Sequence, residues 1–209
     1  MTEVNVSFIT RNIVENAYTY SEYRELVDNL LKDGKTTGEN HSESMIHHTK
    51  MSVHRMKRLD KQTELFIELK NRLIAIERNM IWLVLTEAWC GDAGQAIPVI
   101  QKMADESPKI QIRYILRDEH LEIMDRFLTN GRSRSVPKLI CLDSRTLEVL
   151  GSWGPRPEVA QIMYKQLRDR DDISNREAAE TLHKWYADDH TVSIQKEFMP
   201  LLDQWEFAG

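Results

Sequence analysis

The stretch Leu85-Thr-Glu-Ala-Trp-Cys-Gly-Asp-Ala-Gly94 decides the fold of this chain. It ends an apolar, β-rich run at residues 80–86, which is typical of a strand buried on both faces. The segment from Gly94 to Ala104 then predicts a helix. Cys90 therefore lies at a junction between a strand and a helix. The unpaired N–H groups and the dipole of a helix N-terminus favour a thiolate at such a position, and Gly91 permits a tight turn there.

Length and composition indicate a globular protein with one main domain. The chain has 209 residues, of which 41% are hydrophobic and 29% are charged. No apolar run approaches the roughly 18–20 residues that span a bilayer, so we expect no membrane segment. The first ten residues have no basic stretch before an apolar one, so we expect no cleaved secretory signal.

The net charge and the number of cysteines indicate which partners and which cellular compartment to expect. The net charge of −5 argues against nucleic acid, because binding to phosphates needs a basic surface. The chain has two cysteines, Cys90 and Cys141, which do not make a disulfide framework. We therefore expect a reducing, cytoplasmic environment.

Hydrophobic periodicity predicts the element order β-α-β-α-β-β-α with further helices before and after it. The predicted strands are 80–86, 110–116, 136–142 and 147–151, and the predicted helices between and after them are 94–104, 120–128 and 157–171. The additional helices are 21–31, 45–76 with one break, 175–189 and 192–207. We divide the chain into an N-terminal helical extension (1–64) packed on the core, a core (65–171) and a C-terminal helical extension (172–209).

Four separated features resemble the thioredoxin superfamily over residues 65–170. Trp89-Cys-Gly-Asp-Ala93 matches the family's W-C-G-P-C at its first three positions and departs at the last two. Pro98 matches the proline that bends the family's active-site helix, and Arg134-Ser-Val-Pro-Lys-Leu139 resembles the segment around its cis-proline. Gly154 suits the glycine before the last helix. The resemblance is closest to a bacterial branch with an enlarged helical N-terminus.

The resemblance implies an α/β, thioredoxin-like fold with a mixed central sheet of about four strands and additional N- and C-terminal helices. It also implies a cis peptide bond between Val136 and Pro137. That bond would bring the backbone of Val136 opposite Cys90, where it can position an extended thiol substrate. The thiolate environment would then consist of Trp89, Gly91 and Asp92.

Three positions depart from the family pattern, and they affect how Cys90 could complete a cycle of thiol–disulfide exchange. Ala93 replaces the resolving cysteine, so a mixed disulfide at Cys90 needs an external thiol for its release. Asp92 would favour the helix start but raise the pKa of the thiol by repulsion. The family's buried proton acceptor falls at Val84, so this role is vacant unless Glu87 or Asp92 fills it.

Three interpretations of Cys90 remain open on sequence alone. Cys90 could perform monothiol thiol–disulfide exchange on protein disulfides, with glutathione, bacillithiol or another low-molecular-weight thiol as co-substrate and no bound cofactor. The fold could instead be a non-catalytic protein-binding module. Finally, Cys90 could be a small buried hydrophobic residue.

Other residues enter as secondary candidates. Arg132 and Arg134 precede Pro137, so we expect them to form a rim that lowers the thiol pKa or holds a glutathione carboxylate. Cys141 lies four residues beyond Pro137, about 13 Å along a strand, and is predicted to be structural. His41, His47, His48 and His54 lack metal-ligand spacing, so no metal site is predicted.

Overall fold

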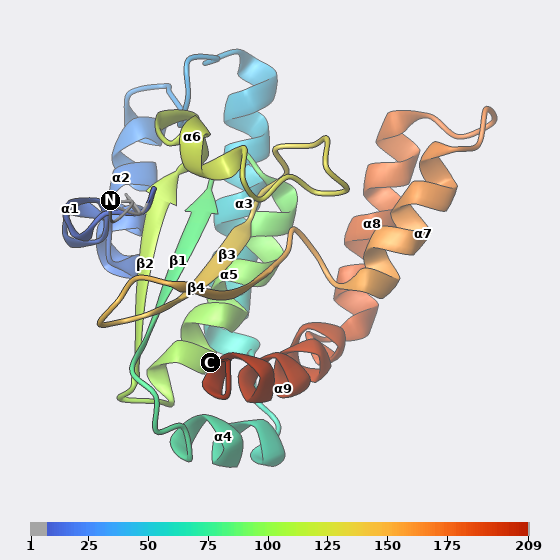
Figure 1. Ribbon diagram of the computed structural model, residues 1–209. Coiled ribbons are helices and arrows are strands. Elements are labelled where there is room, and N and C mark those ends of the chain that lie inside the picture. Colours follow the sequence, from blue (N-terminus) through green and yellow to red (C-terminus); the bar gives the residue numbers. More distant parts are fainter. Residues whose placement is uncertain (1–7, 209) are drawn as a thin grey trace.

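A computed structural model describes residues 8–208 and contains one four-stranded mixed sheet in the order β2-β1-β3-β4 (Figure 1). β1 (Met80–Thr86) pairs in parallel with β2 (Ile110–Leu116) and antiparallel with β3 (Lys138–Asp143). β3 also pairs antiparallel with the edge strand β4 (Val149–Trp153). The sheet and its flanking helices confirm the predicted α/β, thioredoxin-like fold.

Helices occupy both ends of the chain and the connections between strands. Before the sheet lie α1 (Arg11–Asn16), α2 (Tyr20–Lys32), α3 (Glu43–Gln62) and α4 (Ile67–Ile74). Within it lie α5 (Gly91–Asp105), a short 3₁₀ turn (Arg117–Glu119) and α6 (Leu121–Met124), and after it lie α7 (Glu158–Arg168), α8 (Asn175–Asp189) and α9 (Val192–Glu206).

Several boundaries differ from the sequence prediction. The helix predicted from residue 120 to 128 ends at Met124, and the chain then turns so that Thr129 N–H donates to the carbonyl of Ser133. The helix α5 begins at Gly91 rather than Gly94, because Cys90 itself acts as its N-cap. α2 begins at Tyr20, one residue before the predicted start at residue 21, and is capped by Thr19 in a reciprocal pair with Glu22.

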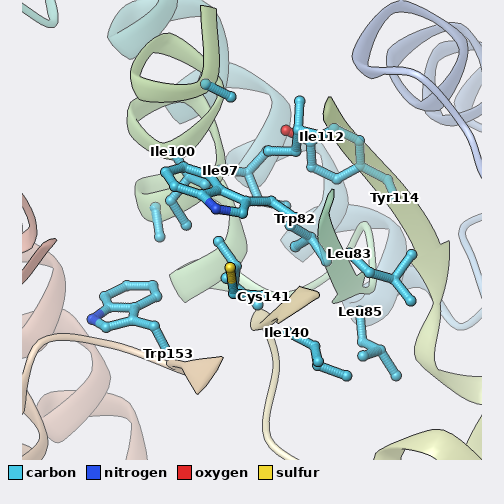
Figure 2. Close-up of a cluster of buried hydrophobic side chains, with 14 of the residues drawn as sticks. Trp82, Leu83, Leu85, Ile97, Ile100, Ile112, Tyr114, Ile140, Cys141 and Trp153 are labelled. Atoms are coloured by element: carbon cyan, nitrogen blue, oxygen red, sulfur yellow. The ribbon is translucent and has the colours of Figure 1, made fainter. Parts of the chain in front are cut away.

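The core lies on both faces of the sheet, and every residue of β1 is buried. Figure 2 shows Trp82 beside Ile97 and Ile100 of α5, with Cys141 close by. The Trp82 ring also contacts Phe198 and Trp205 of α9, with ring centroids 5.5 and 5.9 Å apart. α5 and α9 therefore share one apolar layer with the centre of the sheet.

α3 packs directly against α5, close to the N-terminus of α5. A Cβ added at Gly94 would come within 2.6 Å of the Ser52 hydroxyl oxygen and 3.0 Å of the Ser52 backbone. Only glycine permits this approach. The Ser52 hydroxyl also donates to the carbonyl of Cys90 (3.2 Å), so the N-terminal helices fix the position of the cysteine.

α7 and α8 form a hairpin that extends away from the sheet (Figure 1). Three buried residues of the hairpin, Ala160, Leu182 and Tyr186, form a small cluster separate from the main core. The base of this hairpin lies at the site described next.

Candidate functional site

Cys90 and the cis-proline segment meet, although 46 residues separate Cys90 from Val136. The Cys90 thiol donates to the carbonyl of Val136 (3.0 Å), and its sulfur accepts from the Ala93 N–H (3.5 Å). The Val136–Pro137 bond is cis, as expected from the family resemblance. The structure therefore brings Cys90, Gly91, Asp92, Val136 and Pro137 together at the N-terminus of α5.

The Cys90 thiol is buried and protonated. Its residue is 9% exposed, and burial, followed by repulsion from Asp92, raises the pKa of the thiol to about 12. The N–H groups of Ala93 and Asp92 and the charge of Arg156 lower this pKa only in part. The dipole effect predicted from the sequence is present, but desolvation is the larger effect.

Asp92 is the centre of a buried polar cluster beside the thiol. Its carboxylate accepts from the Arg156 guanidinium (2.5 Å) and from the Tyr186 hydroxyl (2.8 Å). Arg156 follows β4, whereas Tyr186 belongs to α8. Burial raises the pKa of Asp92, and Arg156 and Tyr186 oppose that shift. The Asp92 carboxylate thus connects the α7–α8 hairpin to α5.

His183 of α8 and Arg55 of α3 cover Gly91. A Cβ at Gly91 would lie 2.6 Å from the His183 ring and 3.3 Å from the Arg55 guanidinium. Burial, and then the nearby charge of Arg55, lowers the pKa of His183 to about 4, so its imidazole is neutral at pH 7. Helices from both extensions therefore close over the residue next to the cysteine.

Glu87 is a second buried carboxyl group near the site. It is 0% exposed, and one of its oxygens accepts from the Asp118 N–H (3.0 Å). Burial raises its pKa. Asp92 acts on the Cys90 pKa more directly, since its repulsion is the second largest cause of that shift. Trp89 is half-buried and lies under the Arg117 guanidinium (5.0 Å).

The two arginines expected to form a rim lie on the surface. Arg134 makes a two-pronged ion pair with Asp125 (2.6 and 2.7 Å), and Arg132 lines a hollow beside α7. Within the described chain, no hydrogen bond or ion pair joins either guanidinium to Cys90. The charge of Arg156 lowers the Cys90 pKa, and the charge of Arg55 also interacts with the thiol.

Sequence reasoning missed Arg156, Tyr186 and His183. Arg156 carried a local signal, because it stands between two prolines in Gly154-Pro-Arg-Pro157, which fixes the backbone on either side. No local sequence pattern indicates Tyr186 or His183, because both reach the site only when α8 packs against α5.

The remaining chemistry-bearing residues are placed elsewhere. Cys141 is fully buried in β3, with its sulfur 3.6 Å from the Met80 sulfur. Residues 8–208 contain no group of three or more His, Cys, Asp or Glu side chains arranged to hold a metal ion. No helix in the same range is both long and apolar enough to cross a membrane.

Comparisons with known proteins agree with this geometry. A family model described as thioredoxin matches residues 38–168, which is more than half of the chain. No curated protein is similar enough to count as a match. The chain therefore belongs to the thioredoxin family.

Two solved structures share the fold at low sequence identity. One is a protein of unknown function from Pseudomonas aeruginosa (17% identity, TM-score 0.55), whose similarity covers 92% of this chain and 99% of that one. The other is an HIV epitope scaffold (19% identity, TM-score 0.53), whose similarity covers 87% of this chain and 98% of that one. Both similarities extend beyond the sheet to the added helices.

Proposed function

We propose that this protein performs thiol–disulfide exchange with Cys90 as its single reacting sulfur. The observation that carries the proposal is the 3.0 Å contact between the Cys90 thiol and the Val136 carbonyl, beside a cis-proline and at a helix N-terminus. In this arrangement a bound disulfide could pair with the Val136 backbone while one of its sulfurs faces Cys90. The loss of the thiol proton to solvent generates the nucleophile.

The exchange needs two steps, because Ala93 provides no second sulfur. The Cys90 thiolate attacks one sulfur of a substrate disulfide, which forms a mixed disulfide and releases the other sulfur as a thiolate. A low-molecular-weight thiolate then attacks the substrate sulfur of the mixed disulfide, which forms a disulfide between the substrate and the small thiol and releases Cys90 as a thiolate. We place this activity in a bacterial cytoplasm, where such thiols are abundant.

The covered thiol imposes a condition on this activity. A thiol with a pKa of about 12 is protonated at neutral pH and reacts slowly. Displacement of α8 would expose Cys90 to water and remove much of the desolvation that raises its pKa. We therefore propose that exchange occurs from a conformation in which His183 and Tyr186 have left the active-site helix.

A non-catalytic binding module is the second candidate. It is favoured by the burial of Cys90 beneath residues of α3 and α8. In that case the thiol would be a structural hydrogen-bond donor to Val136, and the added helices would provide the interface.

Thiol trapping distinguishes the two functions. The chain with Cys141→Ala would be incubated with oxidised glutathione and with an alkylating reagent across a range of pH, and adducts at Cys90 would be measured by intact mass. We expect a glutathione adduct that is absent when Cys90 is also changed to Ser. No adduct, together with an apparent thiol pKa at or above about 8.5, would support the binding module.

A further inference from the structure

Lys138 is a buried cation that lacks a counter-charge. It is 6% exposed and follows the cis-proline at the start of β3. Its ammonium group donates to the carbonyl of Gly154 (2.8 Å), and no carboxylate within residues 8–208 forms an ion pair with it. An ammonium group has three N–H donors, so this single bond leaves the group incompletely paired. A buried, unpaired charge destabilises a folded protein unless something compensates for it.

A hollow of about 480 Å³ lies against Lys138, between the edge strand, the loop after α6, the start of α7 and the middle of α9. This volume is in the range of small-molecule sites. Its apolar wall includes Trp153, Pro155 and Leu201. A second hollow, lined by Arg132 and Lys165, continues from it along α7.

The acidic residues of the hollow do not neutralise Lys138. The Glu197 carboxylate accepts from the Trp153 indole N–H (2.7 Å) and from the Glu158 backbone N–H at the start of α7 (2.6 Å). Each of its oxygens accepts one of these bonds, and the Lys138 pKa is shifted by burial with no contribution from a neighbouring charge. The Glu158 side chain lies on the exposed rim and makes no ion pair with Lys138.

Three further polar atoms around the hollow have no partner. They are the Arg156 Nε–H, the Thr129 hydroxyl and the Gln161 side-chain oxygen, and all three residues line the hollow. Buried polar groups are nearly always paired in proteins. These three atoms are themselves closed off from the hollow, so the groups that face a ligand are the cation of Lys138, with its unused N–H donors, and the apolar wall. A cation beside an apolar wall is the pattern of a site for an anionic organic molecule.

We propose that this hollow binds a small organic carboxylic acid, whose carboxylate pairs with Lys138 and whose apolar body lies against Trp153. The carboxylate supplies the missing counter-charge and accepts from the unused ammonium N–H groups. Inorganic anions lack the body that the apolar wall would cover. The inference does not depend on thiol exchange, because Cys90 does not line the hollow.

The protonation of Lys138 makes binding pH-dependent. Burial lowers the pKa of Lys138 to about 8, and the charged groups around the hollow are Arg156, Glu158 and Glu197. A bound carboxylate favours the charged amine, so affinity should be constant between the pKa of the ligand's own carboxyl group and that of Lys138, and should fall as the pH rises above the latter.

The test is an NMR titration of the Trp153 indole N–H with 3-phenylpropionate, compared with its neutral amide and with sulfate. We expect saturable binding of the acid and affinity for the amide that is lower by about tenfold or more, since a hydrogen bond to a charged group contributes about 1.5–3 kcal/mol. Sulfate should bind more weakly than the acid. Cys90→Ser should bind the acid unchanged, which separates this site from the thiol.

Variants with matched charge complete the test. Lys138→Met should abolish the preference for the acid over the amide, whereas Lys165→Gln, which removes an exposed amine from the neighbouring hollow, should leave it intact. Equal binding of acid and amide by the unaltered chain, sulfate binding as tight as the acid, or no saturable shift with the acid would each overturn the proposal. These comparisons use the natural chain and so hold even if Lys138→Met fails to fold.

Discussion

The two C-terminal helices are attached to the molecule in different ways. α9 inserts Phe198, Leu202 and Trp205 into the main core, and all three are fully buried. α8 instead packs its apolar residues against α7 and reaches the active-site helix mainly through Tyr186 and His183. The first attachment is apolar and the second is polar.

This difference indicates which helix can move. Removing α9 would expose a large apolar area, which the hydrophobic effect opposes. Removing α8 from α5 would break the Tyr186 bond to Asp92 and expose groups that water can solvate. Regions with few buried apolar contacts open at lower free energy than the core. The polar attachment of α8 is therefore suited to uncovering Cys90.

The largest expected effect is on α9. Trp205→Ala should lower the free energy of unfolding by about 3–5 kcal/mol, because it leaves a cavity beside Trp82 and Phe198. Trp185→Ala, on the half-buried face of α8, should cost much less. Urea denaturation of both variants measures the difference. Equal losses would contradict the division between an apolar and a polar attachment.

A smaller loss is expected when the polar attachment is altered. Asp92→Asn keeps the shape but leaves Arg156 without its charge partner, so we expect a loss of about 2–3 kcal/mol. The same change should lower the pKa of the Cys90 thiol, because repulsion from Asp92 raises it. Alkylation rate against pH reports that shift.

Tyr186→Phe is the matched control for Asp92→Asn. It removes one hydrogen bond to the same carboxylate and leaves the charge pair, so about 1 kcal/mol should be lost. A slower alkylation of Cys90 in Asp92→Asn than in the unaltered chain would show that Asp92 assists the thiol rather than opposing it.

Acidification should weaken the docking of α8. The folded pKa of His183 is about 4, against an ordinary value of 6.5. Between pH 6.5 and pH 4 the imidazole of His183 is therefore protonated in the unfolded chain but neutral in the folded chain. The free energy of unfolding falls as the pH is lowered through this range. His183→Gln should lose less stability between pH 7.5 and pH 5 than the unaltered chain, as measured by denaturation at both values. An identical loss would show that His183 is solvated.

Local sequence was enough to predict the parts of the fold that depend on local patterns. β1 and β2 occupy the predicted residues, 80–86 and 110–116. A continuous apolar run indicates a strand buried on both faces, and an alternating pattern indicates a strand buried on one face. α8 also starts at the predicted Asn175, after a Ser174 cap. Boundaries set by tertiary contacts, such as the early end of α6 at Met124, were not predicted.

The sequence predicted the junction that holds Cys90 and the cis bond before Pro137, but not the electrostatics around the thiol. The motif located Cys90 and the cis bond before Pro137. The sequence did not show that helices α3 and α8 cover the thiol, and that covering makes desolvation the largest influence on its pKa. Lys138 was visible only as a charge inside an apolar strand, since its lack of a counter-charge depends on where Glu197 lies.

The smallest expected effect is that of Arg134, the arginine that the sequence assigned to the thiol. Arg134→Gln removes an exposed cation already paired with Asp125, so neither stability nor the Cys90 alkylation profile should change measurably. Its contrast is Arg156→Gln, which breaks the buried pair with Asp92 and should raise the Cys90 pKa and slow alkylation, because the charge of Arg156 lowers that pKa. If Arg134→Gln changed the alkylation profile and Arg156→Gln did not, Arg134 would be the arginine that influences the Cys90 pKa. That result would also mean that Cys90 reacts from a conformation in which the cis-proline loop, rather than α8, has moved.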